Sequence, residues 1–517
     1  MKRIGIDVGG TNTDAVLIQD RRVVQAVKTP TTADVTSGIK TALAQLLAAV
    51  PDAVQAVEAV MIGTTHFTNA VVQRRGLNKV GALRIGLPAS ASLGPFVDWP
   101  KDLAGLVKGA TCMVEGGHEY DGRPLVPLDR RAIRDAARRF GDLGLEAIAV
   151  TSIFSPLTAE CEVQAAEILR EELPAARITL SHELGRIGLL ERENVALLNA
   201  CLQDLAQTTS RAFTDAIAAS GIRAPLYLTQ NDGTIMLSAV AERFPVYCFA
   251  SGPTNSMRGA VFLSGIEDSV VVDVGGTTTD IGYVKHGFPR EANNAVQIGG
   301  VRTLFRMPDL LSLGLGGGTE IDRATGTIGP GSVGYRLTSE ALVFGGRQLT
   351  ATDIAVAAGI LDLGDRSRVA DLPSRFLREM LARMHAMIAE GMDRMKTEAG
   401  DVPLIAVGGG SFLIPEQIEG ASEVVRVQHH AVANAVGAAI AQVSGEIDQI
   451  FSGIGRDAAI AKAEELAARR AVAAGADAQS LRVVEVEDLP LAYLPGNALR
   501  VRLRMIGDIA ARQPAMS

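Results

Sequence analysis

The sequence predicts an α/β protein of two related lobes, followed by a small C-terminal α+β unit. Short apolar runs alternate with helical patterns along most of the 517 residues, which is typical of α/β proteins. One octapeptide occurs twice, in different halves of the chain, and this predicts a duplicated lobe. The length exceeds what one hydrophobic core usually organises. We therefore expect three units, at residues 1–182, 183–445 and 446–517.

Local patterns predict the elements of the first unit. Apolar runs next to turn residues predict strands at residues 4–6, 15–18, 59–62 and 147–150. Apolar positions at helical spacing predict helices at residues 36–50 and 130–143.

The same patterns continue through the other two units. In the second unit the sequence predicts helices at residues 191–219 and 375–397 and strands at residues 226–228, 270–272 and 404–407. The methionines of the second of these helices have helical spacing, which favours the core. In the third unit, residues 456–475 predict a helix. Residues 501–505 alternate apolar and basic side chains, which is typical of an exposed strand.

Composition disfavours several classes of function. A net charge of −8 and an aromatic content of 4% argue against a nucleic-acid binder, since phosphates are repelled and stacking side chains are few. The four cysteines are far apart, with no C-x-x-C pair, which indicates buried thiols in a reducing compartment. There is no apolar stretch of about twenty residues to span a membrane. We expect a cytoplasmic protein.

The repeated octapeptide is the most informative feature. Asp7-Val-Gly-Gly-Thr-Asn-Thr-Asp14 and Asp273-Val-Gly-Gly-Thr-Thr-Thr-Asp280 agree at seven of eight positions, and each lies between two apolar runs, as at a β-hairpin tip. Paired glycines allow close approach to a ligand, and successive N–H groups form a nest for an anion. The tips therefore suit a polyphosphate, with the aspartates holding Mg²⁺ or its waters. The alternative is two tight hairpins in which these residues only serve the turns.

Two later segments, a glycine run and a small-residue helix, follow the two octapeptides in the chain. The glycine run at residues 408–410 ends a buried strand and suits contact with an adenosine, although it could instead be a closely packed turn. Residues 433–440 predict a small-residue helix that packs tightly at an inter-lobe hinge. From residue 2 to 442, this order resembles the actin-like ATPase superfamily of sugar kinases, heat-shock chaperone ATPases and actin. The resemblance implies duplicated ribonuclease H-like lobes around a nucleotide cleft.

Further segments narrow the resemblance. They lie in a fixed order around the two octapeptides, at residues 62–76, 190–192, 198–200, 230–233, 250–253 and 315–319. Together they are similar to the hydantoinase A/oxoprolinase family, which implies ATP-dependent opening of cyclic amides such as hydantoins, 5-oxoproline or lactams. In that family, phosphorylation of the amide carbonyl oxygen is thought to activate the ring carbon for water. It further implies a separate hydrolase subunit and an oligomer.

The resemblance assigns roles to single residues. The expected phosphate and adenosine contacts are Gly9, Gly10, Thr11, Thr13, Gly275, Gly276, Thr277, Thr278, Gly408, Gly409 and Gly410. Asp7 and Asp273 are expected to bind Mg²⁺, and the catalytic set is Asp7, Asp273, Thr65, Glu191 and Arg192. The expected substrate contacts are Thr64, Asn69, Asp232, Ser251 and Thr319.

Several of these residues have structural alternatives. Thr65 and Asn69 could cap the helix that begins near Phe67, and Glu191 could form an ion pair with Arg192. The segment 251–253 could be a turn. His66 is better explained as a neutral packing residue than as a general base. Residues 429–430 are adjacent histidines on a predicted strand, which point to opposite faces and do not suit a metal.

Two departures from the family pattern keep other functions open. The tail is compact, whereas the family usually has a larger C-terminal domain there. His66-Phe67 replaces the usual Val-Ala, and this replacement indicates a subgroup with its own substrate. A small-molecule kinase would leave phosphate on its product. A regulatory or assembly ATPase would show slow turnover that depends on no small molecule. Fold alone does not decide among these chemistries.

Overall fold

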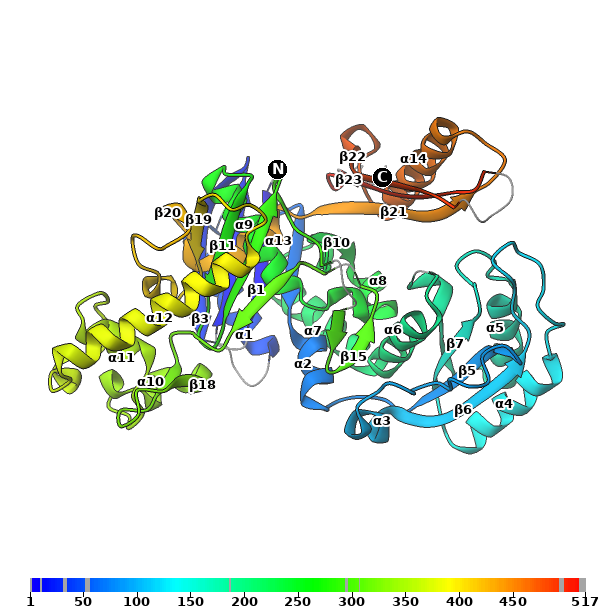
Figure 1. Ribbon diagram of the computed structural model, residues 1–517, viewed down its shortest axis with the longest axis horizontal. Helices are drawn as coiled ribbons and strands as arrows, with labels where there is room; N and C mark the ends of the chain where they lie inside the picture. Colours follow the sequence, from blue (N-terminus) through cyan, green and yellow to red (C-terminus); the bar gives the residue numbers. More distant parts are fainter. Residues whose placement is uncertain are drawn as a thin grey trace.

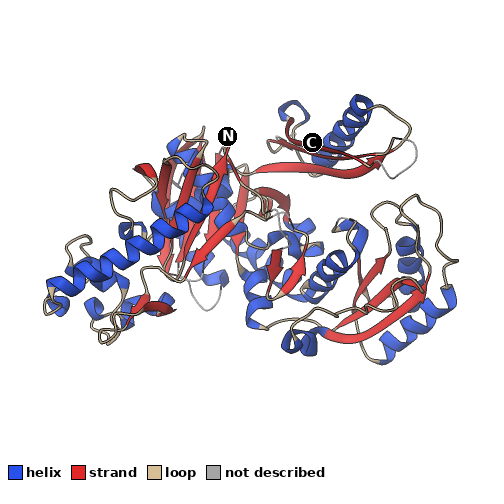
Figure 2. Cartoon of the chain, in the orientation of Figure 1, coloured by secondary structure: helices blue, strands red, loops and turns tan. Residues whose placement is uncertain are grey.

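The computed structural model describes residues 2–9, 12–30, 35–51, 56–185, 187–292, 296–305, 307–491 and 497–510. Within these ranges the chain forms five β-sheets flanked by helices (Figures 1 and 2). The largest sheet has nine strands and the next has six. The predicted α/β class is confirmed, and the two largest sheets repeat one arrangement of strands, as the predicted duplication requires.

The nine-stranded sheet carries the first octapeptide. Its strands in spatial order are β22 (Arg482–Pro490), β23 (Leu499–Gly507), β21 (Gln442–Phe451), β10 (Thr234–Leu237), β9 (Leu226–Thr229), β4 (Ala59–Thr64), β1 (Lys2–Val8), β2 (Asn12–Gln19) and β3 (Arg22–Pro30). The hairpin β1–β2 is antiparallel, and β4 runs parallel to β1. Helices α1 (Val35–Ala49) and α7 (Gln203–Ala219) contribute to the core on one face, with Ile4 and Ile6.

The six-stranded sheet repeats this arrangement around the second octapeptide. It contains β13 (Phe288–Pro289), β12 (Thr279–Lys285), β11 (Ser269–Val274), β19 (Val402–Val407) and β20 (Ala421–Arg426), with β16 (Leu310–Leu313) beside β12. The hairpin β11–β12 is antiparallel and β19 runs parallel to β11, as β4 does to β1. Helix α12 (Ser374–Met395) covers one face, and its Met380 and Met384 are fully buried, so the core role predicted for them is confirmed.

Two helices lie between these sheets and touch each other. Helix α9 (Ser251–Ser264) packs on β11 and β19, and α13 (Ala433–Ile440) packs on β1 and β2. A Cβ on Gly437 would lie 1.8 Å from the backbone oxygen of Asn255, and one on Gly259 would lie 2.0 Å from that of Ala433. The small-residue helix predicted at 433–440 is therefore present, and glycine is what allows the two backbones to approach so closely.

The remaining elements form smaller layers. A parallel sheet contains β6 (Lys108–Glu115), β5 (Val80–Leu87), β7 (Ala147–Ser152) and β8 (Arg177–Leu180). Helices α3 (Lys101–Val107), α4 (Arg130–Asp142) and α5 (Glu160–Glu172) accompany it. Two separate hairpins are β14 (Val296–Ile298) with β15 (Val301–Thr303), and β17 (Thr319–Ile321) with β18 (Ile328–Ser332). The other helices are α2 (His66–Gln73), α6 (Leu189–Cys201), α8 (Ser238–Arg243), α10 (Leu337–Glu340), α11 (Ala351–Ala357) and α14 (Arg456–Ala473).

Three expectations about elements are corrected. The predicted helix 191–219 is two helices, α6 and α7, which meet at the fully buried Leu202. Strand β9, expected in the second lobe, pairs with β4 in the first sheet. Strand β23 is not exposed, because it lies between β21 and β22, where its arginines pair with acidic residues of both neighbours.

The cysteines are free thiols, and three of the four are buried. Within the described ranges, none of the helices combines the length and the apolar character that crossing a membrane requires.

Candidate functional site

The two octapeptides form hairpin tips with the same local geometry. Asp7 pairs in register with Asp14, and Asp273 pairs in the same way with Asp280. The Gly9 N–H donates to the Asn12 carbonyl at 3.0 Å, and the Gly275 N–H donates to the Thr278 carbonyl at 2.8 Å. The glycine repeat therefore closes the same turn twice. Gly10 and Thr11 lie outside the described residues.

Each tip carries a carboxylate whose charged form is disfavoured, and of the two residues Asp7 is buried and Asp273 half-buried. Burial raises the pKa of Asp7 to about 7, and the nearby Asp14 and Asp273 charges add to the rise, while Asn434 opposes it. Burial likewise raises the pKa of Asp273 to about 6, with Asp280 adding to the rise and Ser256 opposing it. Charge on one tip therefore acts on the other, since Asp273 contributes to the raised pKa of Asp7, and Asp14 to that of Asp273.

A lysine partly offsets this negative charge. The Lys28 ammonium, on β3, donates to both carboxylate oxygens of Asp14 at 2.7 Å. It also favours the charged forms of Asp7 and Asp273 from a longer range. Asp280, in the second tip, accepts a hydrogen bond from Ser312. Asp7 and Asp273, one from each tip, thus both have raised pKa values, and an added cation near them would lower the electrostatic energy.

Two glycine loops support the second tip. The N–H groups of Gly317 and Gly318 donate to the carbonyls of Gly275 and Gly276 at 3.0 and 2.7 Å. The Gly410 N–H donates to the Val274 carbonyl at 2.7 Å. These bonds fix the backbone of the tip from two sides.

The glycine run 408–410 lies against this tip. A Cβ on Gly408 would lie 2.3 Å from Asp273 Oδ1, so a side chain there would displace the carboxylate. A Cβ on Gly409 would meet nothing within 4 Å. Gly409 is exposed, so the run presents an open backbone surface next to the second tip.

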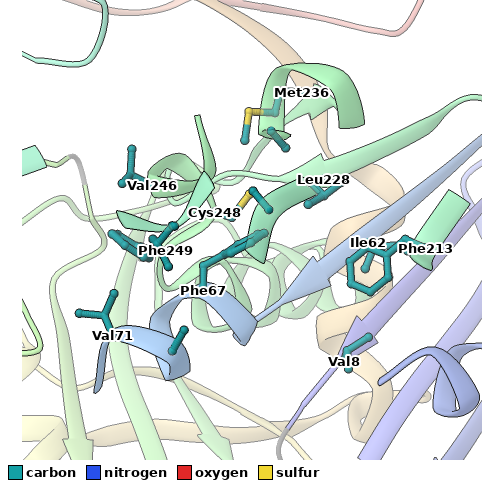
Figure 3. Packing of buried hydrophobic residues seen from close by; sticks show 14 of the residues in the cluster. Val8, Ile62, Phe67, Val71, Phe213, Leu228, Met236, Val246, Cys248 and Phe249 are labelled. Atoms are coloured by element: carbon teal, nitrogen blue, oxygen red, sulfur yellow. The ribbon is translucent and has the colours of Figure 1, made fainter. Parts of the chain in front are cut away.

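The first tip packs against a hydrophobic cluster that also includes residues from the start of α2. Val8, Ile62 and Phe67 belong to this cluster (Figure 3). Val8 pairs in register with Thr64, which places the end of β4 directly beside the tip. The Ser251 hydroxyl, at the start of α9, approaches the Thr64 carbonyl at 3.5 Å. Thr64 and Ser251 are therefore brought together next to Asp7.

The start of α2 adds two more of the expected residues. The Asn69 amide donates to Thr65 Oγ1 at 3.2 Å, whereas Thr65, at the N-cap position, makes no capping bond with its side chain. Segment 251–253, considered as a turn, begins α9 instead, after Ala250 in a left-handed conformation. Burial lowers the pKa of His66, which agrees with the neutral histidine expected there.

The threonines of the tips differ in exposure. Thr277 and Thr278 are exposed, whereas Thr13 is fully buried in β2, where its carbonyl accepts from the Thr29 hydroxyl. Thr319 is also fully buried, and its hydroxyl oxygen accepts from the Gly316 N–H at 2.7 Å within its own loop. Thr13 and Thr319 thus support the loops from inside.

Glu191 and Arg192 point to different partners. Glu191 pairs with Arg302 of β15 at 3.1 Å. The Arg192 guanidinium is fully buried and donates to Ser181 Oγ at 2.9 Å and to the Ile187 carbonyl at 2.7 Å. Burial lowers the pKa of Arg192 to about 10. These contacts tie α6 to its surroundings, and the predicted catalytic role of both residues remains a prediction.

Asp232 lies where three parts of the chain meet. It caps the β9–β10 turn through the Thr234 N–H at 3.0 Å and pairs with Arg504 of β23 at 3.2 Å. The neighbouring Glu291, which follows β13, pairs with Arg502 at 2.9 Å. The structure thus places Asp232 in an ionic network with the tail, and its predicted contact with substrate remains a prediction.

Sequence reasoning missed the polar residues that flank Asp7. Lys28 lies opposite Asp14 in the β2–β3 pairing, and only the register of that pairing reveals it. Asn434 donates its amide to Asp7 Oδ2 at 3.3 Å. It is the one polar residue of the otherwise apolar segment 433–440, and that exception was a signal in the sequence.

The residues present fit a magnesium–nucleotide. The fully buried Asn255 carries an oxygen without a hydrogen-bond partner, and this side chain adjoins Gly63 and Asp7. Within the described ranges, no group of three or more acidic, histidine or cysteine side chains forms a metal site. Mg²⁺ usually binds one or two carboxylates and takes its other ligands from water and phosphates, so Asp7 and Asp273 are the residues that would hold it.

Two family models match the chain. The hydantoinase/oxoprolinase N-terminal region matches residues 3–173, and the hydantoinase/oxoprolinase model matches residues 192–365. The chain is 28% identical to the acetophenone carboxylase gamma subunit of Aromatoleum aromaticum, over 69% of this chain and 53% of that protein. It is 26% identical to the caprolactamase subunit alpha of Pseudomonas jessenii, over 69% and 54%. The chain therefore spans about half the length of these curated relatives.

Two solved structures share the fold. The ATP-dependent caprolactamase from Pseudomonas jessenii superposes with a TM-score of 0.79 at 21% identity, covering 100% of this chain and 89% of that chain. Nucleotide-free acetone carboxylase superposes with a TM-score of 0.72 at 19% identity, covering 99% and 89%.

Proposed function

Because this chain belongs to the hydantoinase/oxoprolinase family, we propose that it is the ATP-binding subunit of an enzyme that opens cyclic amides. The substrates would be of the hydantoin, 5-oxoproline or lactam type. The observation that carries the proposal is the pair of matching hairpin tips, each with an aspartate of raised pKa at the same position of the turn. Such a pair is suited to a metal-bound polyphosphate held between two lobes.

Different residues of the chain would bind the metal, the phosphates, the adenosine and the substrate. Asp7 and Asp273 would hold Mg²⁺, and the backbone N–H groups of both tips would bind phosphate oxygens. The open surface at Gly409 would face the adenosine. Thr64 and Ser251, which lie beside Asp7, would orient the carbonyl group of the substrate.

Activation of a carbonyl oxygen explains why an amidase would need a nucleotide. Resonance makes an amide carbon a poor electrophile. When bound, ATP supplies a phosphoryl group whose transfer to that oxygen makes the ring carbon far more reactive toward water. The protein's task is then to position the acceptor and neutralise the developing charge.

The carboxylase relatives favour a second candidate, a ketone acceptor. Acetone, acetophenone and caprolactam each contain a carbonyl oxygen, so one phosphoryl-transfer site would serve either class. We propose a separate partner subunit in both cases, because the relatives are named as subunits. A cyclic amide remains the first candidate because of the family match.

Isotope transfer tests the proposal. The chain, alone and with any subunit that copurifies, is given ATP, Mg²⁺ and caprolactam, 5-oxoproline or hydantoin labelled with ¹⁸O at the carbonyl. We expect ADP formation that depends on the cyclic amide, ring opening, and label in the released phosphate, read by ³¹P NMR. Asp273→Asn should abolish these signals, whereas Asp457→Asn, at a fully exposed side chain, should not.

The other outcomes identify the other functions. Stimulation by acetone or acetophenone with bicarbonate, but by no amide, would establish the ketone acceptor. A stable phosphorylated product would indicate a kinase. ATP turnover that no small molecule changes would overturn both carbonyl acceptors in favour of a regulatory ATPase.

A further inference from the structure

We propose that Asn434 is a positioning residue that fixes the Asp7 carboxylate for the metal–nucleotide and ties it to the crossing of α9 and α13. This inference rests on the proposed function and assigns a new residue to the same site. Asn434 donates its side-chain amide to Asp7 Oδ2 at 3.3 Å. It is half-buried, and every other residue of α13 is apolar or glycine.

The backbone that carries Asn434 is held from two sides. A Cβ on Gly5 of β1 would lie 2.1 Å from the Ala435 backbone oxygen. On the other side, α9 touches α13 at Gly437 and Gly259, as described above. Since α13 is wedged between β1 and α9, the Asn434 side chain starts from a fixed position. A residue placed so firmly can orient its partner.

A second amide, from α9, adjoins the other oxygen of Asp7. The point where a Cβ on Gly63 would lie is 2.6 Å from Asn255 Nδ2 and 2.9 Å from Asp7 Oδ1. Asn255 Nδ2 donates to Thr229 Oγ1 at 3.0 Å, which leaves Oδ1 as the amide atom available to another partner. That oxygen is buried without a hydrogen-bond partner, and Asn255 itself is fully buried.

The unpartnered oxygen of Asn255 indicates a donor in the bound state. The ionised form of Asp7, which is the form that would bind a metal ion, cannot supply one, because an ionised carboxylate only accepts hydrogen bonds. A water held by a metal ion beside Asp7 can, and buried acceptors are normally satisfied. Asp7 would therefore be flanked by one amide from each helix of the crossing, with Asn434 orienting the carboxylate and Asn255 receiving the water.

The charges around Asp7 explain why the hydrogen bond from the Asn434 amide should matter for metal binding. The charged neighbours that act on Asp7 are the aspartates 14 and 273, which repel it, and Lys28, which is engaged by Asp14. Asn434 contacts Asp7 directly, without adding charge. Hydrogen bonds to charged groups are stronger than neutral ones, so losing this donor should weaken metal binding roughly tenfold.

Calorimetry with and without metal tests the inference. Binding of adenylyl-imidodiphosphate is measured in Mg²⁺ and in EDTA for the native chain, Asn434→Leu and Asn434→Gln. Leucine matches the shape of asparagine without its donor. We expect Asn434→Leu to lose roughly tenfold in affinity with Mg²⁺ and to keep its affinity in EDTA, and Asn434→Gln to recover part of the loss. The linewidth of bound Mn²⁺ in EPR should change in Asn434→Leu as well.

A matched control and a second variant keep the outcomes separate. Asn78 also donates its amide to an aspartate, Asp204, on the surface, so Asn78→Ala should behave as the native chain does. If Asn434→Leu does not fold, Asn434→Ser is judged by the same criterion. Equal losses in Mg²⁺ and EDTA, or no loss, would overturn the role of Asn434. Absence of nucleotide binding by the native chain would instead overturn the proposed function, and the inference with it.

Discussion

At the scale of single residues, the site is defined by two poorly solvated carboxylates, those of Asp7 and Asp273. Asp7 and Asp273 gain no direct cationic partner among the described residues, and burial is the main reason why their pKa values rise. An interior carboxylate of this kind costs stability when it ionises. Proteins retain such groups at functional sites, where a ligand's charge compensates for them.

Replacement of Asp7 should therefore change the pH dependence of stability. Its pKa is raised from 3.8 to about 7, so its favourable contribution is complete below about pH 4 and is lost as the pH rises through 7. At about 1.4 kcal/mol per unit, the metal-free native chain should lose on the order of 4 kcal/mol over that range. Asp7→Asn cannot ionise and should escape this loss.

Urea unfolding at pH 4.5, 6 and 8, without metal or nucleotide, measures the difference between the two proteins. Asp457→Asn is the control, because that side chain is fully exposed and should follow the native curve. Parallel curves for Asp7→Asn and the native chain would show that Asp7 is not perturbed in solution.

At the scale of elements, the crossing of α9 and α13 joins the two sheets. Asn434 of α13 donates to Asp7 of the first tip, and Ser256 of α9 opposes the rise in the pKa of Asp273 in the second tip. The contact depends on small residues at the closest approach.

Gly437→Ala should destabilise the chain by about 1–3 kcal/mol through overpacking, even though alanine favours a helix by about 1 kcal/mol. The added methyl group would overlap the Asn255 backbone at 1.8 Å. Gly409→Ala, which meets nothing within 4 Å, should leave stability unchanged and weaken nucleotide binding. Thermal unfolding and calorimetry of both variants measure these effects, and equal stability of the two would contradict the tight contact.

At the scale of the whole molecule, the tail is not a separate appendage. Strands β21, β23 and β22 extend the sheet that begins at β1, and the long β21 strand leads from the body of the protein into the tail (Figure 1). Arg504 pairs with Asp232 at 3.2 Å and with Glu485 at 3.4 Å, and it approaches Glu291 at 3.8 Å. It thus connects the first sheet, the tail and the segment after β13.

Arg504→Met should cost about 1–3 kcal/mol, because it removes a nearly buried guanidinium that pairs with three partly exposed carboxylates. The tail should then unfold before the sheets, as an earlier transition in scanning calorimetry and as faster hydrogen exchange in β23 than in β1. Arg456→Gln removes an exposed pair with Asp488 and should leave the transition as it is in the native chain, because exposed ion pairs contribute little. A single unshifted transition in Arg504→Met would show that the network does not join the tail to the lobes.

The sequence by itself determined the elements and the repeat. The two octapeptides, the strands beside them and the small-residue helix are local patterns, and local patterns specify turns, strands and helices because they act between neighbours in the chain. The hairpin registers at Asp7 and Asp273 follow directly from them. The family resemblance came from the same local segments.

Only the tertiary structure decided which distant residues meet. In the folded chain β9 pairs with β4. Glu191 and Arg192 have different partners and do not pair with each other. Thr13 and Thr319 are buried. The tertiary structure also brought Lys28 to Asp14, and Asn434 to Asp7 across more than four hundred residues. Such contacts depend on strand pairing and helix packing between distant parts of the chain. The local sequence around each residue is compatible with many partners, and strand register together with close packing determines which one it meets.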